Sequence, residues 1–275
     1  MRNCRLTILF IVSAFICKAQ TLRSPAAARY LGAGAYSKEF ADVFSVTANQ
    51  AALAEINTIQ TGVYGERRFL NTGINFYSAI IAVPSASGNF AVQADYSGYK
   101  NYNETQFGIA YARRLAKTIT IGAKFNYYNV RIPVYGSAGT VNFEIGSIWA
   151  LTPSLRAGFH VYNPVGGSLG KNSGEKLSSA YKAGLGYEFS KNFFTSAEIV
   201  KEETKDVNIN IVMLYHFAGQ FFLRCGIATE TSTTFIGIGY KKKNLRLDAA
   251  ASYHQQLGLS PGLMLLYSFP EKENE

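Results

Sequence analysis

The fold class of this chain is decided by the segment Ile119-Thr120-Ile121-Gly122-Ala123-Lys124-Phe125-Asn126-Tyr127. Its odd-numbered residues are apolar or aromatic, and the residues between them are small or polar. Successive side chains of a β-strand point to opposite faces, so the apolar residues share one face of a sheet. In an α-helix the same residues would be scattered around the circumference. The segment therefore predicts a strand with one apolar and one polar face.

The same alternation recurs along most of the chain after residue 58. It predicts about fourteen strands, each close to the roughly ten residues that a tilted strand needs to cross a bilayer. The expected strands are 59–69, 74–83, 88–97, 104–114, 119–130, 140–151, 155–162, 179–189, 193–201, 207–217, 221–228, 233–240, 245–253 and 262–269. The alternation is most broken in the first and ninth of these strands.

The connections between the expected strands alternate between short and long, with two exceptions. The short set is Pro84–Gly88, Leu115–Thr118, Thr152–Ser154, Ser190–Asn192, Ala218–Gln220 and Lys241–Asn244. The other set includes Tyr99–Asn103, Arg131–Gly139, Asn163–Ser178 and His254–Pro261, although 202–206 and 229–232 are short as well. Outer-membrane barrels have short periplasmic turns and longer outer loops. The parity therefore supports an even strand number, with both ends of the barrel in the periplasm.

A soluble β-sandwich or lipocalin-like barrel is the alternative to a membrane barrel. Charged residues make up 16% of the chain and aromatic residues 14%, whereas ordinary globular domains are roughly 25% charged. The expected polar strand faces are rich in glycine, which is unusual for a soluble surface. Tyr and Phe gather near strand ends, where a membrane barrel places its aromatic girdles. These features favour an all-β, transmembrane antiparallel barrel.

The first residues read as an export signal. Arg2 and Arg5 precede an apolar stretch over residues 6–16, and Cys17-Lys18-Ala19 offers a small-x-small cleavage site. A lipoprotein signal acylated at Cys17 is disfavoured because Phe15 and Ile16 stand where small residues belong. The expected organisation is a signal peptide at 1–19, an arm at 20–58, the barrel at 59–270 and a polar periplasmic tail at 271–275. Only Cys225 remains after cleavage, which excludes an intrachain disulfide.

The arm at 20–58 lacks alternation and contains a helical run around Ser37–Ala54. A fourteen-stranded lumen is wider than its own side chains can fill, so we expect the arm to lie inside as a plug. Repeated glycines on the inward face indicate either barrel curvature or the close approach of another segment. The inward polar residues carry both signs, which favours internal pairing over an ion filter. They are Lys124, Glu144, Arg156, Lys182, Glu188, Arg224, Arg246 and Asp248.

A motif in the arm resembles the amino-terminal signature of FadL-type and PorV/PorQ-type barrels. It comprises Ala28-Arg29-Tyr30-Leu31-Gly32-Ala33-Gly34-Ala35, then Asp42, then Asn49-Gln50-Ala51-Ala52-Leu53, with Gln50 in place of the usual proline. The resemblance implies that Arg29, Gly32, Gly34, Asp42 and Asn49 set the conformation of the arm. The signal ending in Ala19-Gln20 resembles those of Bacteroidota, which implies the outer membrane of such a bacterium.

Relatives of this type imply two functions. The first is an accessory barrel in a protein-export machine of the type IX kind, with outer-membrane lipid and other outer-membrane or surface proteins as partners. The second is a FadL-like passive channel for hydrophobic or small solutes. A purely structural barrel is a third possibility. We take the export role as the main hypothesis and the channel as its alternative.

No catalytic or cofactor motif is evident, so we predict that the chain is not an enzyme and needs no cofactor. The three histidines, His160, His216 and His254, do not have metal-ligand spacing, and G-x-S-x-G is absent. The chain has a net charge of +9. Its Lys and Arg residues are mostly scattered singly, however, which argues against nucleic-acid binding.

Overall fold

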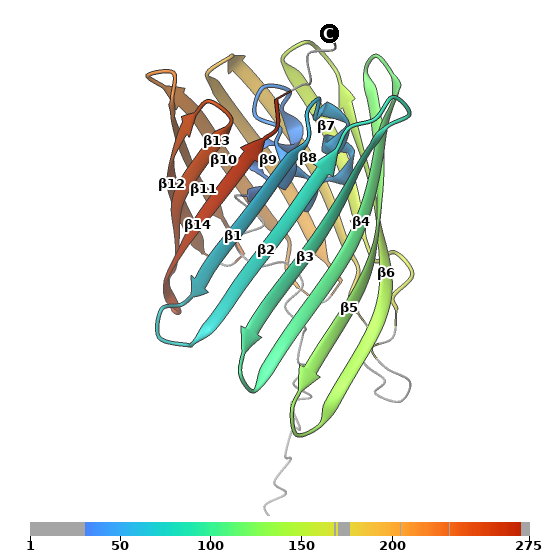
Figure 1. Ribbon diagram of the computed structural model, residues 1–275, viewed down its shortest axis with the longest axis vertical. Helices are drawn as coiled ribbons and strands as arrows, with labels where there is room; N and C mark the ends of the chain where they lie inside the picture. Colours follow the sequence, from blue (N-terminus) through green and yellow to red (C-terminus); the bar gives the residue numbers. More distant parts are fainter. Residues whose placement is uncertain (1–30, 168, 170–176, 204, 231, 271–275) are drawn as a thin grey trace, which may run out of the picture.

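The computed structural model describes residues 31–167, 169, 177–203, 205–230 and 232–270. The expected signal peptide, Arg29 and the 271–275 tail lie outside this part of the chain. Fourteen antiparallel strands form a closed barrel in which every strand pairs with its neighbours in sequence and β1 pairs with β14 (Figure 1). The strands are β1 (Gln60–Arg68), β2 (Ile74–Val83), β3 (Asn89–Tyr99), β4 (Tyr102–Ala116), β5 (Ile119–Ile132), β6 (Gly136–Ala150), β7 (Leu155–Tyr162), β8 (Ala180–Ser190), β9 (Phe193–Glu202), β10 (Asn208–Phe217), β11 (Phe221–Ala228), β12 (Thr233–Lys242), β13 (Leu245–His254) and β14 (Gly258–Ser268).

The predicted fold class and strand number are confirmed, including the two strands with broken alternation. Three of the expected outer loops are wrong. The pairs β3–β4, β5–β6 and β13–β14 continue to tight turns, because the strands extend into residues that were assigned to loops. Gly136 has φ +97° and Gly258 has φ +87°, a backbone region that glycine adopts without strain. The connection between β7 and β8 remains long.

The strands alternate between the two faces of the wall as expected. On β5, Phe125 and Tyr127 point outward and are 57% and 51% exposed, whereas Lys124 and Asn126 point inward and are 4% and 0% exposed. An apolar exterior around a polar interior is the arrangement of barrel walls that contact lipid. No helix in the described part of the chain is long and apolar enough to span a bilayer.

The start of β1 and the end of β14 lie at the same rim of the barrel, which we call the terminal rim. The backbone N–H of Phe269 donates to the carbonyl of Ile59 at 2.8 Å. The six short turns, near residues 84–88, 117–118, 151–154, 191–192, 218–220 and 243–244, lie at this rim, at the top of Figure 1. We call the opposite end the loop rim.

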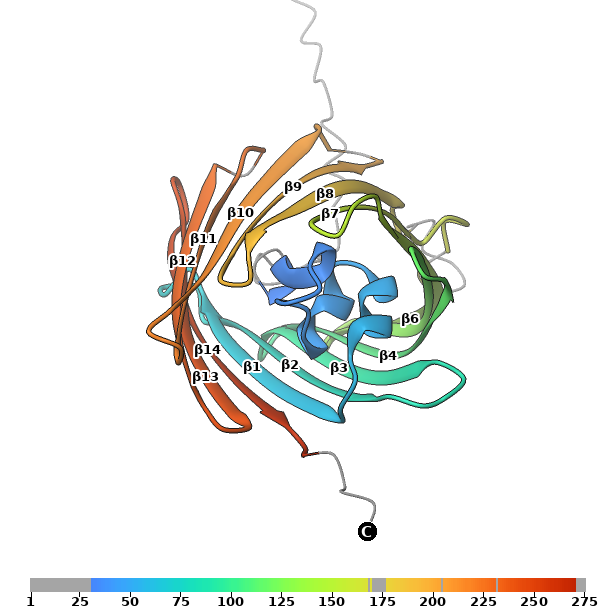
Figure 2. The same ribbon diagram turned by 90° about the horizontal axis from the view of Figure 1, so that it is seen from above.

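Residues 31–58 lie inside the barrel near the terminal rim (Figures 1 and 2). They form three short 3-10 helices, η1 (Ala33–Tyr36), η2 (Val43–Thr47) and η3 (Gln50–Glu55), in place of the single helical run expected over 37–54. The run is interrupted because Asp42 and Asn49, both in extended conformation, each restart a helix. The helices bury Phe44, Val43 and Leu53 completely against the wall.

Candidate functional site

The site is the interface between this arm and the inner face of the wall. Its local shape is set by two N-caps. The Asp42 carboxylate accepts from the backbone N–H of Phe44 at 2.9 Å, and the Ser45 hydroxyl accepts from the N–H of Asp42 at 3.1 Å. The Asn49 side chain accepts from the N–H of Ala51 at 3.0 Å. These contacts satisfy amides that a helix start leaves without partners.

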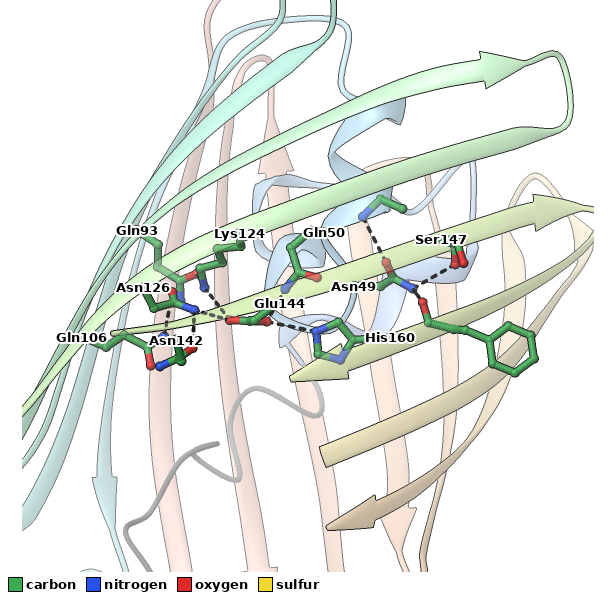
Figure 3. A network of polar contacts seen from close by, with 12 residues as sticks. Asn49, Gln50, Gln93, Gln106, Lys124, Asn126, Asn142, Glu144, Ser147 and His160 are labelled. Atoms are coloured by element: carbon green, nitrogen blue, oxygen red, sulfur yellow. Dashed lines mark hydrogen bonds and ion pairs between the residues drawn. The ribbon is translucent and has the colours of Figure 1, made fainter. Parts of the chain in front are cut away.

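Asn49 also joins the arm to the wall. Its side-chain amide donates to the carbonyls of Ser147 on β6 and Phe159 on β7, at 3.3 and 3.1 Å (Figure 3). One side chain therefore caps η3 and fixes its position against two strands. Asn49 is one of the residues that, by the resemblance, should set the conformation of the arm.

Glycines of the wall leave room for the arm. A Cβ atom on Gly146 would lie 2.1 Å from the Asn49 Oδ1, and one on Gly122 would lie 2.5 Å from the backbone of Gln50. The ring of Tyr36 lies over Gly158 and Gly184, where a Cβ would come within 2.4 Å of its carbons. The close-approach interpretation of the inward glycines is confirmed at these positions. It does not hold for Gly108 and Gly226, where a Cβ would meet only wall residues: Lys124 and Asn126 at the first, Ile211 and Phe235 at the second.

The glycines of the arm itself permit close packing within it. A Cβ on Gly34 would lie 2.1 Å from the carbonyl oxygen of Phe40, and one on Gly32 would lie 2.5 Å from the Cβ of Ala48. Neither glycine has a positive φ. They are therefore needed for space and not for backbone conformation.

An ionic cluster binds the arm to β13. Arg246 contacts Asp42 of the arm at 3.1 Å and Asp248 of its own strand at 2.6 Å, and Asp248 also pairs with Arg224 on β11. The Arg246 guanidinium lies 4.4 Å from the ring centroid of Phe222. Of the predicted inward residues, Arg246 contacts the predicted arm residue Asp42, and Arg246 is in turn paired with Asp248.

Further carboxylates tie the arm to other parts of the wall. Glu55 at the end of η3 pairs with Arg114 on β4 and Arg156 on β7, at 3.1 and 3.2 Å. Glu188 on β8 accepts from the Ser37 hydroxyl at 2.5 Å and from two arm amides. The hydroxyl of Tyr36 donates to Glu198 on β9 at 2.8 Å.

A polar network on β3 to β7 surrounds Glu144 (Figure 3). Glu144 contacts Lys124 at 3.6 Å and His160 at 3.0 Å, and it accepts from Asn126 at 2.7 Å. The Gln50 amide of the arm donates to the same carboxylate. Because each of these groups is buried, the network links the arm to the wall through charge-assisted hydrogen bonds.

Two arm residues have perturbed acidity. Burial raises the pKa of Asp42 from 3.8 to about 6, against the opposing effect of the Arg246 guanidinium. Burial, followed by the charge of Glu198, raises the pKa of Tyr36 well above its usual value. Asp42 therefore changes its charge near pH 6 while it contacts the wall.

Small cavities lie on both sides of the arm. Two of about 50 and 60 Å³ open toward the loop rim and share Lys182 and Glu202, and one of about 110 Å³ reaches Lys241 at the terminal rim. Ala33 lines the first and third of these cavities, and Leu31 lines the second and third. Leu31 and Ala33 therefore each line cavities toward both rims.

Lys182, one of the predicted inward residues, takes no part in the contacts between arm and wall described above. It lines both cavities on the loop-rim side and has no hydrogen bond or ion pair within the described part of the chain. Sequence reasoning missed Tyr36, Gln50, Glu55 and Glu198. Glu198 has the register of an inward residue, since Ala197 and Ile199 point outward, but the broken alternation of β9 concealed it.

The described residues contain no group of three or more His, Cys, Asp or Glu side chains arranged to hold a metal ion. Cys225 is a free, partly exposed thiol.

No protein-family model matches the sequence, and no curated protein matches it significantly. Solved structures do match in fold. The Pseudomonas putida toluene transporter TodX is 11% identical, with a TM-score of 0.68 over 88% of this chain and 96% of its own. The Ralstonia pickettii toluene transporter TbuX is 12% identical, with a TM-score of 0.64 over 83% and 94%.

A Pseudomonas aeruginosa FadL homologue is also similar, at 12% identity and a TM-score of 0.64 over 88% of this chain and 98% of its own. This chain has the fold of FadL-type outer-membrane barrels. None of these three names refers to PorV/PorQ-type proteins or to Bacteroidota, so that part of the resemblance stays a prediction. At such low identity the likeness concerns the fold alone.

Proposed function

We propose that this chain is an outer-membrane passive channel for small solutes, closed at rest by the arm. The observation that carries the proposal is that Leu31 and Ala33 of the arm line cavities toward both rims. The apolar outer wall supports the membrane location. TodX and TbuX are named as toluene transporters, which supports a channel over an enzyme.

The polar contacts that hold the arm against the wall are noncovalent and therefore reversible. These contacts include the hydrogen bonds and ion pairs of Asp42, Glu55, Glu188 and Glu144. Solute passage then requires that the arm shift and connect the cavities. In this view, transport and arm displacement are one event.

A reversible disulfide tests this coupling. A Cβ on Gly146 would lie 3.0 Å from the Asn49 Cγ; since Cγ is one bond from Cβ, the two Cβ atoms lie within about 4.5 Å, the range that a disulfide needs. We would introduce Asn49→Cys and Gly146→Cys with Cys225→Ser, in a chain without residues 1–19. Proteoliposome swelling would be measured with small sugars, amino acids and an aromatic hydrocarbon.

We expect the oxidised double-cysteine protein to lose solute uptake and to regain it after reduction. Cys225→Ser alone and each single cysteine variant should transport equally in both redox conditions. Equal uptake by the oxidised and reduced lock would refute arm displacement. Uptake by no variant, including a chain that lacks residues 20–58, would refute the channel itself.

The export role has weaker support. It rests on the arm motif, and neither the contacts within this chain nor the names of the three similar barrels point to a secretion partner. Co-purification from native membranes in mild detergent would test it, and migration as a lone barrel would count against it.

A further inference from the structure

The barrel wall at the terminal rim carries exposed charge of one sign, and the arm adds exposed Lys38 and Glu39 inside it. The exposed basic residues at this rim are Arg113, Arg114, Lys117, Lys191, Lys241, Lys242 and Lys243. The six described turns of the rim contain no Asp or Glu. At the loop rim, by contrast, Lys205 stands beside Glu202, Asp206 and Glu230. The basic excess is therefore a property of one end of the barrel.

Three hairpins at this rim repeat an aromatic residue followed by a basic one two positions nearer the rim. The pairs are Tyr111 and Arg113, Phe189 and Lys191, and Tyr240 and Lys242. On β4 and β12 the two-residue spacing puts both side chains on the outer face. Two strand residues rise about 7 Å, so the cation lies nearer to water than the ring by about the depth of a headgroup.

Phe189 and Tyr240 belong to a continuous aromatic belt on the outer face, and Tyr111 stacks separately against Phe90 of β3, with centroids 4.9 Å apart. Phe189 contacts Tyr187 and Phe193, with centroids 4.7 and 5.1 Å apart, and Tyr240 contacts Phe221 at 5.2 Å. Aromatic belts sit at the membrane–water interface. This belt fixes the depth of the rim, and it leaves Arg113, Lys191 and Lys242 at the level of lipid phosphates.

Most of these cations lack a protein counter-ion. Arg114 pairs with Glu55, whereas Arg113, Lys117, Lys191 and Lys242 make no ion pair within the described residues. A basic side chain just outside an apolar wall attracts anionic lipid, at about 1 kcal/mol per residue near the surface. The unpaired charge at the rim therefore fits an anionic partner held at headgroup depth.

We propose that the terminal rim binds anionic phospholipid headgroups, of the phosphatidylglycerol type, in the leaflet that it meets. The phosphate contacts the basic side chains, and the aromatic belt packs against the glycerol and upper acyl region. This binding rests on the membrane location in the proposed function, but not on solute transport.

Trp149 provides a local probe, because it is the single tryptophan of the chain. It lies on β6 opposite Ile119, two residues from Lys117, and its ring contacts the outward Phe159 at 5.3 Å. Quenching of its fluorescence by brominated lipid reports the lipids beside the β4–β5 hairpin. Vesicles would contain brominated phosphatidylglycerol or brominated phosphatidylcholine in an unlabelled background of the other lipid.

We expect the wild type to prefer phosphatidylglycerol about 30-fold at Trp149, the factor that corresponds to the two charges of Arg113 and Lys117 at about 1 kcal/mol each. Arg113→Gln with Lys117→Gln should lower the preference to near one. Arg113→Lys, which keeps the charge, should retain it. Arg131→Gln is the matched control. Arg131 is also exposed on the outer face of the barrel, but it lies on β5 at the loop rim.

Equal quenching by the two brominated lipids in the wild type would overturn the proposal. So would an unchanged preference in the Arg113→Gln, Lys117→Gln variant, or an equal loss in Arg131→Gln. No quenching by either lipid would refute the membrane location itself, and the lipid site with it. A clear lipid preference combined with no solute uptake would leave the rim site standing and remove only the channel.

Discussion

Replacement of Arg246 by Met should release the arm from the wall. Arg246 is the common partner of Asp42 on the arm and Asp248 on β13, at 3.1 and 2.6 Å. Methionine keeps an apolar side chain of similar length but removes the guanidinium and its contact with the Phe222 ring. Arg224 still pairs with Asp248, whereas the ion pair of Asp42 with Arg246 is lost.

The size of the effect follows from burial. Removal of one partner of a fully buried ion pair costs about 3–5 kcal/mol, because the other charge is left unpaired. The side chains of Arg246 and Asp42 retain 11% and 13% of their exposure, so water screens part of the loss. We therefore expect about 2–3 kcal/mol, or roughly a 30- to 150-fold shift in the equilibrium between docked and released arm.

Amide hydrogen exchange in detergent at pH 8 measures this equilibrium directly. Peptides from 31–56 should exchange faster by that factor in Arg246→Met, while barrel peptides from β3 to β5 should not change. Addition of Asp42→Asn to Arg246→Met should slow arm exchange again, because no buried charge on the arm is then left alone. An increase below about threefold, or no recovery in the double variant, would contradict the role given to this ion pair.

Three further changes test other contacts. Burial raises the pKa of Asp42 from 3.8 to about 6, so docking is strongest below pH 3.8 and weakens as the pH rises through 6; arm exchange, corrected for intrinsic rates, should rise accordingly, and Asp42→Asn should remove the dependence. Gly184→Ala should weaken docking by about 1–3 kcal/mol through its clash with the buried Tyr36 ring, measured by the same exchange. Glu144→Gln should lower the urea midpoint of unfolding, and Lys124→Met should restore part of it, because Lys124 is left without its carboxylate.

The strands were predictable because their signal is local. The alternation over 119–127 names the outward and inward residues of β5 without any knowledge of its neighbours, and the turn lengths fixed the parity. The boundaries of β5, β6 and β14 near the loop rim were harder to predict from the sequence. Gly136 and Gly258 form tight turns, and the sequence does not distinguish such a glycine from the start of a loop. Not every Tyr near a strand end belongs to a girdle, because Tyr128 and Tyr162 are buried and face inward.

The arm contacts could be foreseen only as possibilities. Gly146 and Gly184 indicated that something approaches the wall, but not that Asn49 meets one and Tyr36 the other. Such pairings join residues far apart in sequence and depend on how the arm enters a finished barrel. The same is true of the Asp42–Arg246 contact, although both residues were singled out separately.

The shared fold does not determine the solute, because folds host many functions. TodX and TbuX are named as toluene transporters, yet the loop-rim cavities of this chain are lined by Lys182, Glu198 and Glu202. A hydrocarbon that entered there would displace water from charged groups and offer no hydrogen bond in return, which costs several kcal/mol. A solute with its own donors and acceptors would replace that water without this loss. If the chain is the channel proposed above, its lining side chains would favour small polar solutes, although TodX and TbuX, which share its fold, are named as toluene transporters.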